Sequence, residues 1–303
     1  MFRKYTLFVR KAERSFCFFY YLCAIKGMMM KRIFIIIALC GSFLPLSSQT
    51  YDELIIRAMD AVEKDSLYQA EKLFEQALQL EPANMRNALL FSNLGTVQRR
   101  MGKNREAVES YTLALNLTPY SVTMLLNRAS LYLEMDYLDK AYVDYCNVID
   151  LDAKNTEALG FRAYIYMRRR QYLDAKADYQ RLLESMPDDK TARIGMAMVN
   201  QKLQRYQESM DGFNRLVVDY PDDASLLMAR AELEVEMGSL EMALLDLENA
   251  AKFAPDDADI YVMCGEIYLA QGRKREAYVA FEKAIELGVP RPQLQELLKA
   301  SKK

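Results

Sequence analysis

The sequence predicts an all-α fold built from a helical repeat, because three series of residues recur in one register. Alanine recurs at Ala70, Ala107, Ala141, Ala175, Ala243 and Ala277. A large ring or leucine recurs at Phe74, Tyr111, Tyr145, Tyr179, Phe213, Leu247 and Phe281. Proline recurs at Pro82, Pro119, Pro187, Pro221 and Pro255. The usual step is 34 residues, a period that indicates a solenoid in which each repeat buries its apolar face against its neighbours.

The composition agrees with a helical chain that has no catalytic centre. Hydrophobic residues make up 51% of the 303 residues, while Gly and Pro number only 11 and 8, so there are few helix breakers. Histidine is absent, which removes the usual general base near neutral pH and the commonest metal ligand. The sequence therefore predicts a protein that is not an enzyme and has no cofactor and no metal site.

The first element is a predicted signal peptide over residues 30–48. Lys31 and Arg32 precede a mostly apolar run of 14 residues, Ile33 to Leu46, which is short for a membrane span. Residues 1–29 then represent a mis-assigned start or an unstructured segment, and we expect cleavage after Ser48. We therefore predict an exported protein of the periplasm or cell envelope. Two disfavoured alternatives attach it to the membrane, through an uncleaved signal anchor or through lipidation at Cys40, which follows leucine instead of a small residue.

The charge distribution argues against nucleic acid as a partner. Residues 1–48 contain eight of the 40 Lys and Arg but one of the 42 Asp and Glu, so the remainder has 32 basic and 41 acidic side chains. An acidic body lacks the clustered cations that phosphate backbones require. The run Arg168–Arg170 fits a helix end, where cations complement the helix dipole.

Residues 49–289 are predicted to form seven helical hairpins, and residues 290–303 a capping helix. If the proline is position 32 of each repeat, the repeats begin at residues 51, 88, 122, 156, 190, 224 and 258. Small residues at positions 8 and 20 let the two helices approach closely, and the ring at position 24 fills the space between repeats. Proline at position 32 cannot continue the second helix. The paired acids after Pro187, Pro221 and Pro255 are typical of helix N-caps.

This pattern resembles the tetratricopeptide repeat over residues 51–289. The seventh repeat carries the family's position pattern as Tyr261, Gly265, Tyr268, Ala277, Phe281 and Ala284. The resemblance implies a right-handed superhelix whose first helices line a concave groove that docks a peptide or protein.

The groove is predicted from inward-facing positions of the first helices in repeats two to five. The candidate partner-binding residues are Asn93, Thr96, Arg100, Asn127, Ser130, Phe161, Tyr164, Arg168 and Met198. Aromatic and methionine surface beside amides and arginine suits a peptide, although Phe161 and Met198 are also compatible with packing alone. No repeat has the paired Lys and Asn with which family members hold a C-terminal carboxylate.

Three repeats predict an internal ion pair. Arginine at position 7 and aspartate sixteen residues later occur together as Arg128 with Asp144, Arg162 with Asp178, and Arg230 with Asp246. An arginine on the first helix and an aspartate on the second would clamp the hairpin. The alternative is a coincidence of solvated charges.

These observations predict a non-catalytic scaffold of the cell envelope that binds a peptide or protein in the groove. The alternative is an assembly or chaperone-like factor that handles secreted or outer-membrane clients with little sequence selectivity.

Overall fold

The computed structural model describes residues 50–302. The predicted leader, including Cys40, lies outside these residues, so its cleavage and export stay predictions. By its contacts the chain divides into two compact units, residues 1–56 and residues 57–303. Of the first unit only residues 50–56 are described, and α3 begins within them.

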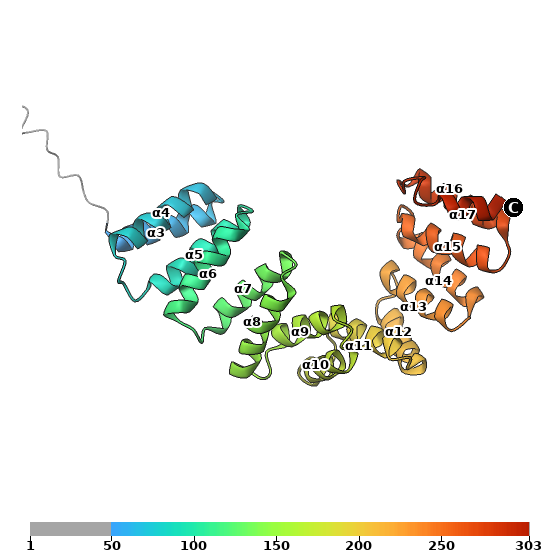
Figure 1. The fold of residues 1–303 in the computed structure, drawn as a ribbon, viewed down its shortest axis with the longest axis horizontal. Helices are drawn as coiled ribbons and strands as arrows, with labels where there is room; N and C mark the ends of the chain where they lie inside the picture. Colours follow the sequence, from blue (N-terminus) through green and yellow to red (C-terminus); the bar gives the residue numbers. More distant parts are fainter. Residues whose placement is uncertain (1–49, 303) are drawn as a thin grey trace, which may run out of the picture. The chain divides into compact units, whose positions relative to one another are not determined.

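Every regular element of the described residues is a helix, which confirms the predicted all-α repeat fold (Figure 1). The first helices of the repeats are α3 Tyr51–Glu63, α5 Asn87–Arg100, α7 Val122–Glu134, α9 Thr156–Arg168, α11 Lys190–Lys202, α13 Ala224–Glu236 and α15 Ala258–Ala270. The second helices are α4 Leu67–Leu80, α6 Asn104–Leu117, α8 Leu138–Leu151, α10 Tyr172–Ser185, α12 Tyr206–Asp219, α14 Leu240–Phe253 and α16 Lys274–Glu286. A short helix, α17 Gln295–Lys302, follows them.

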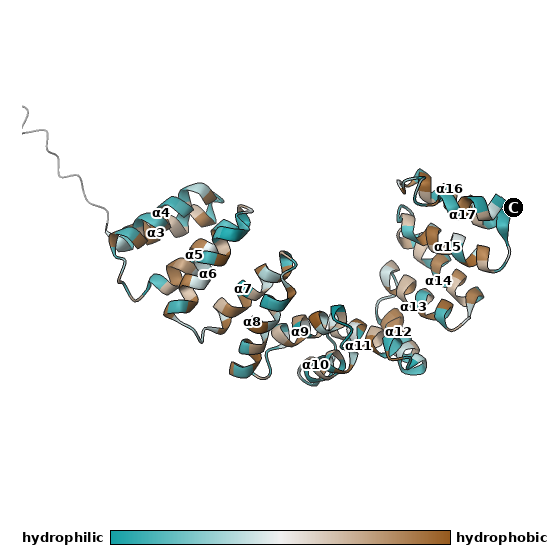
Figure 2. Ribbon diagram, in the orientation of Figure 1, coloured by the Kyte–Doolittle hydropathy of each residue, from teal (hydrophilic) through white to brown (hydrophobic). Residues whose placement is uncertain are grey.

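The helices pack mainly on their neighbours in the chain. The closest pairs are the two helices of one repeat, followed by a second helix with the first helix of the next repeat. Small residues make this approach possible: Ala163 on α9 and Ala175 on α10 are both fully buried. Figure 2 shows hydrophobic and hydrophilic residues intermixed along the helices, as expected where one stripe of a helix faces the core.

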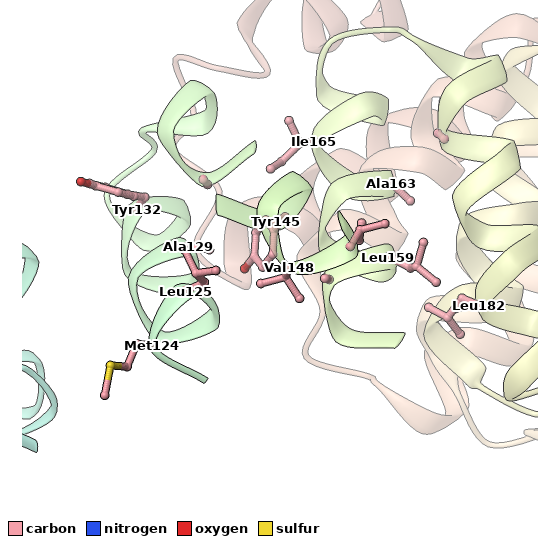
Figure 3. Packing of buried hydrophobic residues seen from close by; sticks show 14 of the residues in the cluster. Met124, Leu125, Ala129, Tyr132, Tyr145, Val148, Leu159, Ala163, Ile165 and Leu182 are labelled. Carbon is pink, nitrogen blue, oxygen red and sulfur yellow. The ribbon is translucent and has the colours of Figure 1, made fainter. Parts of the chain in front are cut away.

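The position-24 rings fill the space between the helices. Tyr145 and Phe213 are fully buried. Figure 3 shows Tyr145 among Leu125, Ala129, Val148 and Leu159, which come from three successive helices. The predicted role of this position as a filler between repeats is therefore confirmed.

The turn inside each hairpin depends on one left-handed residue. Position 15 has a positive φ in all seven repeats, and glycine occupies it at Gly102, Gly238 and Gly272. Four repeats place a side chain there instead, at Asp65, Asp136, Arg170 and Gln204. A non-glycine residue is strained in this region because its Cβ crowds the backbone.

Aspartate caps the first helices of the later repeats, as predicted. The second acid of each pair accepts the hydrogen bond: Asp189 from the amide of Ala192, and Asp257 from the amide of Asp259. Asn155 caps α9 in the same way through the amide of Ala158. The first acid after the proline is therefore a turn residue, and the second fixes the helix start.

All three predicted ion pairs form within their hairpins. Two guanidinium nitrogens of Arg128 donate to the two carboxylate oxygens of Asp144, each at 2.8 Å. The corresponding distances are 2.7 and 2.8 Å for Arg162 with Asp178, and 2.6 and 2.7 Å for Arg230 with Asp246. The aspartates are buried, so these are not solvated surface charges.

The third nitrogen of each arginine reaches back to the preceding repeat. Nη1 donates to Oγ1 of Thr112 from Arg128 (3.1 Å), to Sγ of Cys146 from Arg162 (3.5 Å) and to Oδ1 of Asn214 from Arg230 (2.9 Å). Each acceptor lies sixteen residues before its arginine, on the previous second helix. Each arginine therefore joins three helices.

The last helix, with Leu294 just before it, covers the end of the repeats as predicted for a cap, although it begins at Gln295 and not at residue 290. Leu294 and Leu298 are buried against Ala277, Phe281 and Ala284. The two described cysteines, Cys146 and Cys264, are free and half-buried. Within residues 50–302, no helix has the length and apolar character that crossing a bilayer requires.

Candidate functional site

The predicted groove residues lie on the surface formed by the first helices α5 to α15, which we call the first-helix face. Neighbouring first helices contact one another along it, as α9 and α11 do. Three of the predicted residues expose large apolar side chains there: Phe161 is 37% exposed, Tyr164 41% and Met198 40%. A core residue would be covered, so these side chains are available to a ligand.

A pocket of about 570 Å³ opens on this face between α7, α9, α10 and α11. We call it the central pocket. Three predicted residues line it, Ser130, Phe161 and Tyr164. The other lining residues are Leu133, Glu134, Thr156, Glu157, Gly160, Tyr179, Leu182, Asp189 and Thr191.

The missing side chain of Gly160 leaves part of this space open. A Cβ built at Gly160 would lie 3.2 Å from Cδ1 of Leu182, so a larger residue would occupy the volume between α9 and α10. Thr191 and Glu157 lie near the starts of α11 and α9, where the capped turns expose the first residues of each helix. The pocket therefore follows from the repeat geometry together with one glycine.

Phe161 rests on a buried tyrosine. Its ring stacks on that of Tyr145, with centroids 5.5 Å apart and planes inclined by 19°. The Tyr145 hydroxyl is buried and has no hydrogen-bond partner among the described residues. Burial raises the pKa of this phenol above its usual range, and the carboxylate of Glu157 adds to the shift. A rigid aromatic floor thus lies beneath the exposed ring.

Tyr164 is held by a neighbouring arginine. Nη1 of Arg168 donates to the Tyr164 hydroxyl at 2.9 Å, and Nη2 donates to Oδ1 of Asp136 at 3.3 Å. Asp136 is the left-handed turn residue of the preceding repeat. Arg168 therefore orients the tyrosine and is itself already paired.

The predicted residues on α5, and Asn127 on α7, lie outside the central pocket. Arg100 pairs with Asp65 at 2.7 Å, in the arrangement of Arg168 with Asp136. The Thr96 and Tyr111 hydroxyls are 3.0 Å apart. Nδ2 of Asn93 donates to Sδ of Met59 at 3.7 Å. Asn127 is half-buried on α7.

Arg99 connects this region to the pocket. Its guanidinium donates to Oγ of Ser130 at 2.9 Å and binds both carboxylate oxygens of Glu134. The Glu134 carboxylate raises the pKa of the Arg99 guanidinium. The arginine therefore neutralises one acid at the rim of the pocket.

Sequence reasoning missed most of the polar rim of the central pocket. Glu157 and Thr191 occupy position 2 of their repeats, which faces inward like the positions that supplied Phe161 and Tyr164. Their repeat position could therefore have identified Glu157 and Thr191 as groove residues from the sequence. Tyr179 and Leu182 come from α10, and only the packed structure shows that second-helix residues reach the pocket. The described residues contain no group of three acids or cysteines placed to hold a metal ion.

Family models described as tetratricopeptide repeat match residues 90–120, 122–155, 166–233 and 258–287. The structure is similar to that of a tetratricopeptide repeat protein from Parabacteroides merdae ATCC 43184. The two are 38% identical, with a TM-score of 0.68 over 84% of this chain and 100% of that one.

Over a shorter stretch the chain is also similar to mitochondrial import receptor subunit TOM34. Identity to the Pongo abelii protein is 30% over 113 residues, and to the Homo sapiens protein 28% over 120 residues. These matches cover 36% and 38% of this chain. The chain spans only 37% and 39% of those two relatives.

Proposed function

Because the chain belongs to the tetratricopeptide repeat family, we propose that it is a non-catalytic scaffold that binds a peptide or protein segment on the first-helix face. The observation that carries this proposal is the central pocket, where the exposed Phe161 ring stacks on the buried Tyr145 and the exposed Tyr164 lies beside it in the lining. Rigid aromatic side chains beside a pocket supply a large share of the binding energy at protein interfaces.

The setting we propose is the periplasm or cell envelope. The support is the pattern of residues 30–48, a charged start followed by a short apolar run and small residues. Peptide mapping of the protein from its native cells, after fractionation, tests this part. A mature N-terminus near Gln49 is expected, and peptides from residues 1–27 would contradict it.

Binding is tested with partners captured by the purified protein and identified by mass spectrometry. The affinity of the captured partner is then measured by calorimetry for the wild type and for Tyr164→Ala, which removes an exposed ring from the pocket. We expect a loss of about 1 kcal/mol or more of binding free energy, with little change in the melting temperature.

Tyr120→Ala is the matched control, because Tyr120 is 79% exposed and lies in the turn between α6 and α7. It removes the same aromatic ring away from the pocket and should leave affinity unchanged. Normal binding by Tyr164→Ala would show that the partner uses a different surface.

A further inference from the structure

The charged residues that line the central pocket are all acidic. Its charged lining residues are Glu134, Glu157 and Asp189, and no Lys or Arg lines it. Asp189 caps α11 and Glu134 pairs with Arg99. Glu157 is exposed and forms no salt bridge with any described residue. One carboxylate at the rim is therefore left for a ligand.

A second pocket on the same face repeats this arrangement. It has a volume of about 340 Å³ and lies between α13, the start of α14 and α15, with Val235, Leu240, Met263 and Ile267 as its apolar wall. Its charged residues are Glu232, Glu236 and Glu266, again all acidic. Glu236 lies 3.7 Å from Lys202, while Glu232 and Glu266 are exposed and have no salt bridge within the described residues.

Two other pockets among the described residues have a different charge pattern. The pocket between α14, α15 and α16 contains Arg275 and Lys283 as well as two glutamates. The pocket beside α17 contains Arg291, Lys299 and Lys302. An apolar wall with only acids at the rim is thus shared by the two first-helix pockets and does not simply follow from the acidic composition.

We propose that the first-helix face binds a partner segment in which apolar side chains alternate with lysine or arginine. This inference rests on the proposed function, since it names the chemistry of the segment held there. An apolar side chain enters the central pocket against Phe161 and Tyr164, and the next basic side chain pairs with Glu157. The stem of a long cationic side chain also packs well on an aromatic ring. Acidic segments are repelled at the same rim.

Three synthetic peptides of equal length test whether the first-helix face prefers basic segments. Each alternates leucine with a second residue, which is lysine, glutamine or glutamate, and has blocked termini. We expect the lysine peptide to bind about tenfold more tightly than the glutamate peptide, with the difference falling as salt is added. Fluorescence anisotropy at two salt concentrations measures both effects.

Matched variants locate the charge on the protein. Glu157→Gln should weaken the binding of the lysine peptide by about threefold to fivefold, the upper part of the range of an exposed ion pair, and leave the binding of the glutamine peptide unchanged. Glu208→Gln is the control, because Glu208 is also an exposed acid in the first turn of its helix but lies on a second helix. It should change neither affinity.

The outcomes separate this inference from the proposed function. If the glutamate peptide binds as tightly as the lysine peptide and Tyr164→Ala weakens both, the face binds peptides but the charge assignment is wrong. Equal effects of Glu157→Gln and Glu208→Gln would also overturn the inference, because binding would then reflect net charge alone. If Tyr164→Ala changes the affinity for none of the peptides, the first-helix face is not the binding surface, and both proposals are wrong.

Discussion

Arg162 and Asp178 form a buried two-pronged ion pair between α9 and α10, with N–O distances of 2.7 and 2.8 Å. The hydrogen bond from this arginine to Asp178 is the largest cause that raises the pKa of its guanidinium. Because Asp178 is almost fully covered, removing either partner leaves a charge that water cannot easily reach. The pair therefore fixes how the two helices of a repeat are joined.

We predict that Asp178→Ala lowers the free energy of unfolding by about 3 kcal/mol, because it leaves Arg162 uncompensated. The double variant Arg162→Met with Asp178→Leu should lose clearly less, since no buried charge is then unpaired. Chemical denaturation measures both. Asp60→Ala is the control: it breaks the exposed pair of Asp60 with Lys64 and should cost less than about 1 kcal/mol. A larger loss in the double variant than in Asp178→Ala would contradict this account.

The left-handed turn offers a substitution that stabilises. Gln204 is exposed and has a φ of 58°, at the position where three other repeats use glycine. Gln204→Gly should raise the free energy of unfolding by up to about 1 kcal/mol, because the strain of the left-handed backbone exceeds the added flexibility of the unfolded chain.

The reciprocal change provides the control for this turn. Gly272 has a φ of 75°, and a Cβ built there meets no atom within 4 Å, so Gly272→Ala tests backbone strain alone. It should destabilise by about 1 kcal/mol. Thermal melts of both variants are sufficient, and melting shifts of the same sign would refute the explanation.

Most of the fold was predictable because the same repeat positions pack in the same way in each of the seven repeats. The position-24 rings and the arginine–aspartate pairs recur in the sequence, so each copy supports the others. The central pocket was only partly predictable. Phe161, Tyr164 and Ser130 follow from inward-facing positions, but the space beside them depends on Gly160 and on the rotamer of Leu182 in the next helix. Such features belong to one repeat and leave no periodic signal.

A second glycine explains a tight contact between repeats. A Cβ built at Gly195 on α11 would lie 2.7 Å from both Cε atoms of Tyr179 on α10. Gly195→Ala should therefore destabilise by about 1 to 3 kcal/mol through overpacking, although alanine favours a helix by about 1 kcal/mol. Gly160→Ala is the matched control, since its nearest neighbour is the flexible end of Leu182, and it should be neutral or stabilising. Denaturation midpoints that move equally for both variants would exclude the steric explanation.

Glu234 on α13 is a buried acid, and one of its carboxylate oxygens lacks a hydrogen bond. It is 6% exposed, and Oε2 has no hydrogen-bond partner among the described residues. Arg230 on α13 is already engaged by Asp246 on α14 and Asn214 on α12. Burial, with repulsion from Asp246, raises the pKa of Glu234 from its ordinary 4.5 to about 7, against the opposing effect of Arg230.

This shift fixes the sign of a pH dependence. The folded protein holds the Glu234 proton more tightly than the unfolded chain, so the group favours folding most at pH values below about 4.5. That contribution is lost as the pH rises from about 4.5 through about 7. Above this range Glu234 is ionised in both states and adds no further pH dependence. The buried carboxylate of Glu234 thus destabilises the folded protein at neutral and alkaline pH.

Glu234→Gln should raise the free energy of unfolding at pH 8 by about 1 kcal/mol or more. The amide can donate to Asp246. In the second repeat the same two positions are also hydrogen-bonded, with the Ser110 hydroxyl donating to Oε1 of Gln98 at 2.7 Å. At pH 5 the gain should be much smaller, because Glu234 is then protonated in the folded protein. Denaturation of both proteins at several pH values measures the difference, which cancels the titration of all other groups. The control is Glu232→Gln, an exposed neighbour on α13, which should change the free energy of unfolding by less than about 0.5 kcal/mol. A gain for Glu234→Gln that is the same at pH 5 and pH 8 would mean that Glu234 is ionised throughout, and that its burial does not raise its pKa.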